Sequence, residues 1–259
     1  MSLTFTALLL TLALFVAIIV CMEVGRRLGR VALARNTDGL PKGIGAAEGA
    51  IFGLLGLLIA FTFSGAAARF EDRRHLITEE ANDIGTAWLR IDLLPADAQP
   101  EMRELFRRYL DSRLAVYTDV HNPKTIAAKL AASAELQNQI WAKATQGAHR
   151  PGAASSAPML LLPALNAMFD ITTTRTRAAQ NHPPLVVFLL LPTLVLIASI
   201  LVGFDLSENK VRQPLHILAF AAVMSLTVYV IVDLEFPRFG LIRVDTSDQV
   251  LLELRQSMD

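Results

Sequence analysis

Four long apolar segments dominate the pattern of hydrophobic and polar positions along this chain. They cover residues 3–22, 44–68, 185–204 and 214–232, and a polar stretch of more than 100 residues separates the second from the third. A hydrocarbon core about 30 Å thick needs about 20 helical residues to cross it, and each segment approaches or exceeds that length. The pattern therefore predicts an integral membrane protein with four transmembrane helices in a 2+2 arrangement.

The polar stretch, residues 69–184, has apolar residues at three- and four-residue steps and lacks the alternation that marks strands. Pro100 and Pro123 stand where two of its helices would begin. We therefore expect an all-α fold. Its expected parts are a first transmembrane pair (1–68), a helical extramembrane domain (69–184), a second transmembrane pair (185–233) and a C-terminal tail (234–259).

The second apolar segment continues into the polar stretch without a helix stop, so one helix is expected from Ile44 to Leu94. Along it an apolar or small residue recurs every seven positions, at Gly49, Gly56, Phe63, Phe70, Ile77, Ile84 and Ile91. Such a repeat marks a supercoiling seam. Two alternatives stay open: the seam packs inside one subunit, or it faces a symmetry axis and lines a passage shared by several copies. In the second case Gly49, Gly56, Phe63 and Phe70 are the candidate pore or neck residues.

Small and polar residues in the same segment add two further candidate sites. Gly45, Gly49 and Gly53 recur at four-residue spacing, which lets membrane helices approach closely, so Gly45 and Gly53 are expected to contribute to helix packing. Glu48 is a candidate intramembrane polar site, because ionised groups in a bilayer face a cavity or a partner. The alternative is that Glu48 reaches the headgroup layer.

Composition narrows the functional classes. Hydrophobic residues make up 53% of the 259 residues, and the formal net charge is zero, so no nucleic-acid partner is expected. The single cysteine, Cys21, excludes an intrachain disulfide, and the five histidines are dispersed without ligand spacing, so no metal is expected. Nucleotide-binding and hydrolase motifs are absent from the sequence, and neither an enzyme nor a cofactor is expected.

Four stretches, residues 53–70, 79–95, 168–170 and 233–245, resemble the bacterial bestrophin-like domain family, and the likeness extends over nearly the whole chain. The residues of the last motif are Asp233, Glu235, Pro237, Arg238, Gly240, Arg243 and Asp245. A structural alternative for Asp233 and Glu235 is an ion pair with Arg238 or Arg243.

The architecture is similar, more remotely, to that of bestrophins, which are anion channels of five subunits whose second span lines the pore. This resemblance implies a homo-oligomer, a pentamer like the bestrophins, that conducts inorganic anions such as chloride. It gives no matching position for the acidic calcium clasp of animal bestrophins. The rival class is a non-conducting membrane scaffold or signalling adapter that recruits a partner through its helical domain.

Orientation does not follow from charge, since seven Lys or Arg residues flank the segments on each side. The family resemblance implies a multi-pass protein of the bacterial inner membrane, in contact with lipid. It places both termini and residues 69–184 in the cytoplasm, with residues 23–43 and 205–213 outside.

Overall fold

The computed structural model describes residues 3–35, 44–118, 123–209, 211 and 213–259, and within these every regular element is a helix. Lys42, Lys210 and Arg212, which enter the charge comparison above, lie outside the described residues. The elements are α1 (Leu3–Arg35), α2 (Ile44–Leu89), η1 (Arg90–Leu93), α3 (Gln99–Thr118), α4 (Pro123–Ala148), α5 (Ala157–Gln180), α6 (Leu185–Asp205), η2 (Leu206–Glu208), α7 (Pro214–Glu235), η3 (Asp245–Asp248) and α8 (Gln249–Ser257). The all-α prediction is confirmed.

Four of the described helical segments are long and apolar enough to cross a membrane by length and composition, as predicted. The first helix differs from expectation because it continues beyond the apolar run to Arg35, so the loop expected to begin at residue 23 begins later. An i,i+4 ion pair between Glu23 and Arg27 lies on this extension. The extension also packs against η2, and this tertiary contact helps to stabilise it as a helix.

The chain forms two compact units. The first comprises Met1–Phe70 and His182–Arg243, and the second comprises Glu71–Asn181 and Val244–Asp259. The residues expected to form a separate tail are therefore divided between the units.

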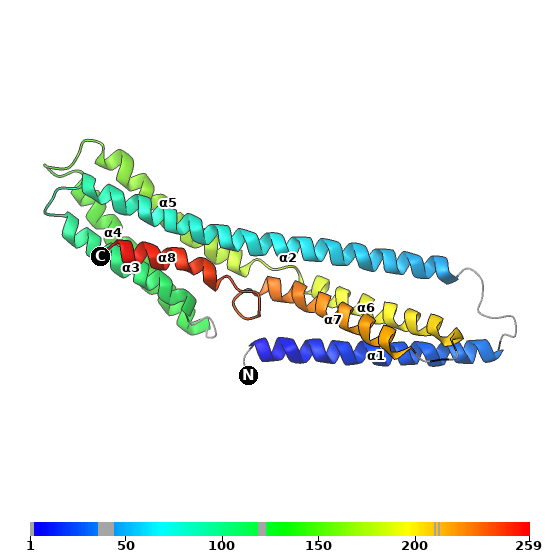
Figure 1. Ribbon diagram of the computed structural model, residues 1–259. Helices are drawn as coiled ribbons and strands as arrows, with labels where there is room; N and C mark the ends of the chain where they lie inside the picture. Colours follow the sequence, from blue (N-terminus) through cyan, green and yellow to red (C-terminus); the bar gives the residue numbers. More distant parts are fainter. Residues whose placement is uncertain (1–2, 36–43, 119–122, 210, 212) are drawn as a thin grey trace. The chain divides into compact units, whose positions relative to one another are not determined.

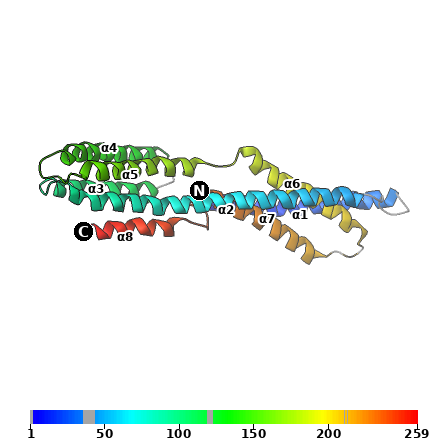
Figure 2. The same cartoon turned by 90° about the horizontal axis from the view of Figure 1, so that it is seen from above.

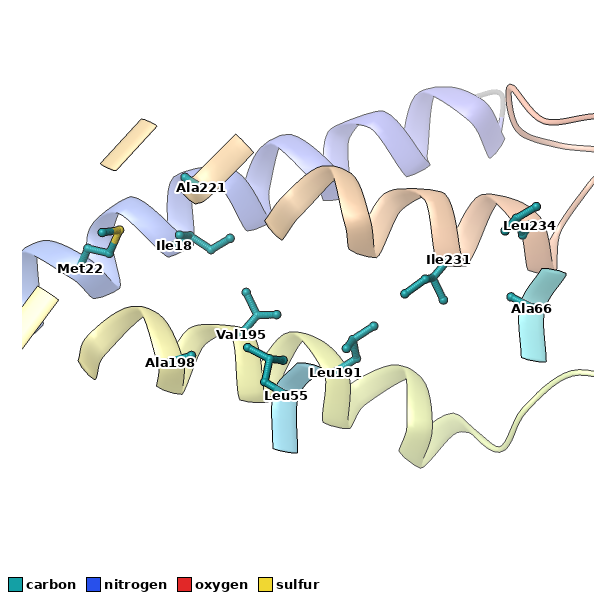
Figure 3. Packing of buried hydrophobic residues seen from close by; sticks show 10 residues of the cluster. All are labelled: Ile18, Met22, Leu55, Ala66, Leu191, Val195, Ala198, Ala221, Ile231 and Leu234. Carbon is teal, nitrogen blue, oxygen red and sulfur yellow. The ribbon is translucent and has the colours of Figure 1, made fainter. Parts of the chain in front are cut away.

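In the first unit, which we call the membrane unit, α1 packs along α6 and α7 (Figure 1). Its apolar core draws on four helices, and Figure 3 shows how the side chains converge. The core residues are Ile18 and Met22 from α1, Leu55 and Ala66 from α2, Leu191, Val195 and Ala198 from α6, and Ala221, Ile231 and Leu234 from α7.

The closest helix approach in the membrane unit uses small residues. A Cβ added to Gly203 of α6 would collide with the backbone of Met22, and one added to Gly25 of α1 would collide with the backbone of Ile200. One turn further on, a Cβ at Gly29 would meet Ser207. Because small side chains let two backbones approach within contact distance, this spacing fixes α1 against α6.

In the second unit, α4 packs on both α3 and α5, and α8 packs on α3 (Figure 2). Its core contains Phe106, Tyr109, Ile140 and Leu165, all fully buried. The helix expected after Pro100 is confirmed as α3, and the one expected at Pro123 as α4.

Glu80 of α2 is fully buried in the second unit between two arginines. Its Oε1 accepts a hydrogen bond of 2.5 Å from Arg113 Nε of α3, and its Oε2 accepts one from Arg175 of α5. Burial by itself raises the pKa of the Glu80 carboxyl, but Arg175 and Arg113 outweigh it and hold the pKa below its ordinary value. The ion pairs therefore tie three helices together through one carboxylate.

Candidate functional site

The part of α2 that lies in the membrane unit has two different faces. One face buries Leu55 and Ala66 in the shared apolar core. Another face is open at its glycines: a Cβ added at any of four of them would meet nothing within 4 Å. These glycines are Gly45, Gly49, Gly53 and Gly56. We call this surface the glycine face of α2.

The aromatic residues of α2 lie at different positions around the helix. Phe63 has 46% of its surface exposed, and Phe61 has 69% exposed. Phe52 and Phe70 are half-buried and pack against the apolar core. Of the four candidate pore residues, Gly49, Gly56 and Phe63 are thus exposed within the chain, whereas Phe70 partly belongs to the core.

The seven-residue seam changes its surroundings along α2. Gly49, Gly56 and Phe63 are open in the membrane unit, but Ile77, Ile84 and Ile91 are buried in the second unit. The second half of the seam therefore packs inside the subunit, whereas Gly49, Gly56 and Phe63 stay exposed in the membrane unit and Phe70 lies half-buried between these two parts.

Glu48 is enclosed, with 6% of its surface exposed. Its carboxyl group lies near that of Asp205 at the end of α6, and its Oε1 has no hydrogen-bond partner among the described residues. Glu48 is therefore enclosed where α2 comes close to the end of α6.

The Asp233–Asp245 motif contains a turn that Asp233 organises from the end of α7. The Asp233 carboxylate accepts hydrogen bonds from the backbone N–H groups of Leu241 and Ile242, at 3.0 and 2.8 Å. A Cβ added to Gly240 would collide with this carboxylate, so glycine is required there. The sequence suggested an arginine partner for Asp233, whereas these contacts are with the backbone.

Glu235, at the last residue of α7, has 1% of its surface exposed and pairs with Arg69 of α2. Arg69 Nε donates to Glu235 Oε1 at 2.8 Å, and Nη2 donates to the same oxygen. His182 Nδ1 lies 3.5 Å from Glu235 Oε2. These contacts join α2, α7 and the segment that leads into α6 at one end of the membrane unit.

The other motif residues support the turn rather than forming a reactive centre. Pro237 is buried, and Arg243 Nε donates to the carbonyl oxygen of Gly240 at 3.1 Å. Arg238 is half-buried in the turn, and Asp245 begins η3. The motif thus holds the chain as it leaves α7.

Sequence reasoning missed two features of the membrane unit. It singled out Gly45 and Gly53 for helix packing, but the close contacts within the chain are at Gly25 and Gly203. The four-residue spacing of Gly25 and Gly29 is a signal that could have pointed to that contact. Arg69 was counted only as a flanking charge, and no local pattern links it to Glu235.

No group of three or more His, Cys, Asp or Glu residues in the described part of the chain is arranged to hold a metal ion. The described residues form a helix face with four open glycines, the enclosed Glu48 carboxyl group near Asp205, and the ion pair between Arg69 and Glu235.

A family profile described as Bestrophin-like domain matches residues 7–249. Among curated proteins, none matches this chain. Two solved structures of a bacterial bestrophin homologue from Klebsiella pneumoniae, both point variants, have a similar fold. Their TM-scores are 0.69 and 0.71, each at 14% identity, and they cover 92% and 95% of this chain and 98% of the homologue. A third structure, described only as a membrane protein variant, has a TM-score of 0.66 at 14% identity, with coverage of 93% and 98%.

Proposed function

This chain belongs to the bestrophin-like family, and from that premise we propose that it forms an oligomeric anion channel in which the seam of α2, with Gly49, Gly56 and Phe63, lines the pore. The conducted ion would be an inorganic anion such as chloride. The protein would lie in the bacterial inner membrane, with several copies arranged around α2.

The observation that carries the proposal is a contrast between two exposed surfaces of the membrane unit. The exposed side of α1 bears large aliphatic residues, among them Leu8, Leu10 and Leu12. Such side chains suit contact with lipid tails. On α2, Leu54 and Leu57 are also exposed, but the four glycines beside them leave the backbone open without a side chain. A helix backbone open in this way fits a water-filled passage or a second copy of the chain better than lipid tails.

The position of Phe63 gives this passage a candidate constriction. Phe63 follows Gly49 and Gly56 along the seam and has 46% of its surface exposed within the chain. Hydrophobic constrictions gate pores by dewetting, and a smaller side chain lowers the barrier to a hydrated ion. A ring of Phe63 side chains from several copies would act as such a neck.

Chloride flux from liposomes containing the purified protein tests the proposal. We expect Phe63→Ala to raise the flux several-fold over the wild type, because the constriction widens. Phe61→Ala is the matched control: Phe61 is exposed two residues away, on a different side of the helix, and its removal should change the flux little.

A second candidate function, a non-conducting scaffold, has an observation of its own. Leu89 and Met159 expose 71% and 79% of their surfaces in the second unit. Arg90 Nη1 donates to the carbonyl oxygen of Leu160 at 2.6 Å, which brings these two segments together. Such an exposed apolar patch could recruit a protein partner. If wild type and Phe63→Ala are folded and oligomeric but give no flux above empty liposomes, the channel proposal fails and the scaffold remains.

A further inference from the structure

A groove of about 290 Å³ lies in the membrane unit between α2, α6 and α7. Its lining residues are apolar except for Thr62, Arg69 and Glu235. The Thr62 hydroxyl already donates to the carbonyl oxygen of Leu58 on its own helix, so it adds no polar site. Leu191 and Ile231, which line the groove, also belong to the apolar core in Figure 3. The groove is therefore an apolar slot with one charged end.

Arg69 has hydrogen-bonding capacity left at that charged end. Its Nε and Nη2 both donate to Glu235, whereas its Nη1 has no hydrogen-bond partner among the described residues. Nη1 lies 3.3 Å from the place where a Cβ of Gly65 would be, and Gly65 itself lines the groove. The guanidinium thus presents a charged N–H edge along α2, towards the apolar slot, and 27% of the Arg69 side chain is exposed.

The length of the groove matches one leaflet of a bilayer. From Leu58 to Arg69, at the two ends of its α2 wall, the helix rises about 16 Å at about 1.5 Å per residue. Half of a hydrocarbon core of about 30 Å is about 15 Å. Arg69 lies just beyond the apolar run of α2, where a headgroup would lie. A ligand with an apolar tail and an anionic head would satisfy both ends of the groove.

The charges at this end of the unit favour an anionic head. Glu235 neutralises one side of Arg69, and the Asp233 carboxylate is occupied by backbone N–H groups. Two further arginines, Arg238 and Arg243, follow α7 in the same unit. Basic side chains at the membrane surface attract anionic lipids.

We propose that this groove is a binding site for an anionic phospholipid. One acyl chain of the lipid lies between α2, α6 and α7, and the lipid phosphate accepts a hydrogen bond from Arg69 Nη1. A charge-assisted hydrogen bond of this type is stronger than a neutral one. The proposal concerns lipid recognition and does not depend on anion conduction, so a protein that fails to conduct can still carry this site.

Native mass spectrometry of the delipidated full-length protein, titrated with phosphatidylglycerol or phosphatidylcholine, tests the site. The wild type should bind phosphatidylglycerol in preference to phosphatidylcholine. Val187→Trp fills the groove with a side chain and should weaken phosphatidylglycerol binding at least about tenfold, since two lost methylene contacts already amount to that. Val186→Trp is the matched control, because Val186 is the neighbouring residue, 66% exposed and outside the groove lining. It should bind as the wild type does.

A double variant tests the headgroup contact without leaving a buried charge unpaired. Arg69→Gln with Glu235→Gln removes both partners and should abolish the preference for phosphatidylglycerol while phosphatidylcholine still binds. Equal binding of the two lipids by the wild type would overturn the headgroup assignment. Oleate binding as tightly as phosphatidylglycerol would overturn the choice of phospholipid. If Val187→Trp changes the oligomer mass but not the bound lipid, a second copy of the chain occupies the groove and the proposal is wrong.

Discussion

Asp233 and Gly240 act as a pair, because the carboxylate of one occupies the space that a side chain on the other would need. The carboxylate holds the backbone N–H groups of Leu241 and Ile242 as the chain leaves α7. Buried acceptors of this kind stabilise a turn only while their donors stay in place. The turn therefore depends on the absence of a side chain at Gly240.

We predict that Gly240→Ala lowers the free energy of unfolding of the purified protein by about 1–3 kcal/mol, and its melting temperature with it. The reason is that the methyl group displaces the Asp233 carboxylate from its donors. Gly85→Ala is the matched control. A Cβ there meets only Leu254 Cδ1 at 3.5 Å, an ordinary contact, and alanine is the better helix former. Gly85→Ala should leave stability unchanged or raise it slightly. Equal melting temperatures for both variants would contradict this account of the turn.

Glu80 makes the stability of the second unit depend on pH. Its pKa in the folded protein is lowered, so the unfolded chain binds its proton more readily than the folded chain does. The stabilisation is therefore fully present above the ordinary carboxyl pKa of 4.5 and is lost as the pH falls through the lower, folded value. Stability should decline on acidification below about pH 4.5.

Glu80→Gln should cost about 3 kcal/mol at neutral pH, because it leaves Arg113 and Arg175 buried without a negative partner. It should also flatten the acid limb of a stability–pH profile measured by denaturant unfolding. Glu79→Gln is the control: its side chain is 48% exposed, and such surface changes stay within about 0.5 kcal/mol. A Glu80→Gln profile parallel to that of the wild type would mean that Glu80 is not the titrating group.

At the scale of the helix, α1 and α2 use glycine for different purposes. Gly25 on α1 lies against the backbone of α6 in the same chain, whereas Gly53 on α2 faces open space. Both positions have the same sequence signature, small residues at four-residue spacing. Only the packing of the helices separates a contact within the subunit from a surface left for something else.

We predict that Gly53→Leu weakens the oligomer while the subunit still folds, because the new side chain stands on the glycine face and must push a neighbouring copy away. Size-exclusion chromatography with light scattering in detergent would show a smaller mass. Gly203→Leu should instead reduce the yield of folded protein, since its side chain meets the backbone of Met22. An unchanged oligomer and an unchanged melting temperature for Gly53→Leu would mean that this face is not an interface.

At the scale of the whole molecule, the central question is which parts lie on which side of the membrane. The balanced basic residues give no answer, so a prediction of orientation rests on the family resemblance alone. We predict that the second unit lies in the cytoplasm.

Labelling of Ser155→Cys in a Cys21→Ser background tests the orientation in intact cells. Ser155 is exposed in the turn before α5, so a reagent that reached it would react. A membrane-impermeant maleimide should leave it unlabelled in intact cells and label it after lysis. Labelling before lysis would show that the orientation of the chain is opposite to the predicted one.

The sequence by itself determined the helical fold, the four candidate spans and the long continuous α2. These are local properties: the length of an apolar run, the three- to four-residue period of apolar positions, and the absence of a helix stop are all written in neighbouring residues. For the same reason the start of α3 at Pro100 was predictable.

Tertiary structure alone decided which face of α2 stays open, where the seam becomes buried, and which charges meet. Arg69 and Glu235 are 166 positions apart, and no pattern of neighbouring residues relates them. Likewise, whether a glycine contacts a backbone or open space depends on where another helix packs. Such contacts form only when distant segments bury a common apolar surface, so the chain must fold before its candidate sites exist.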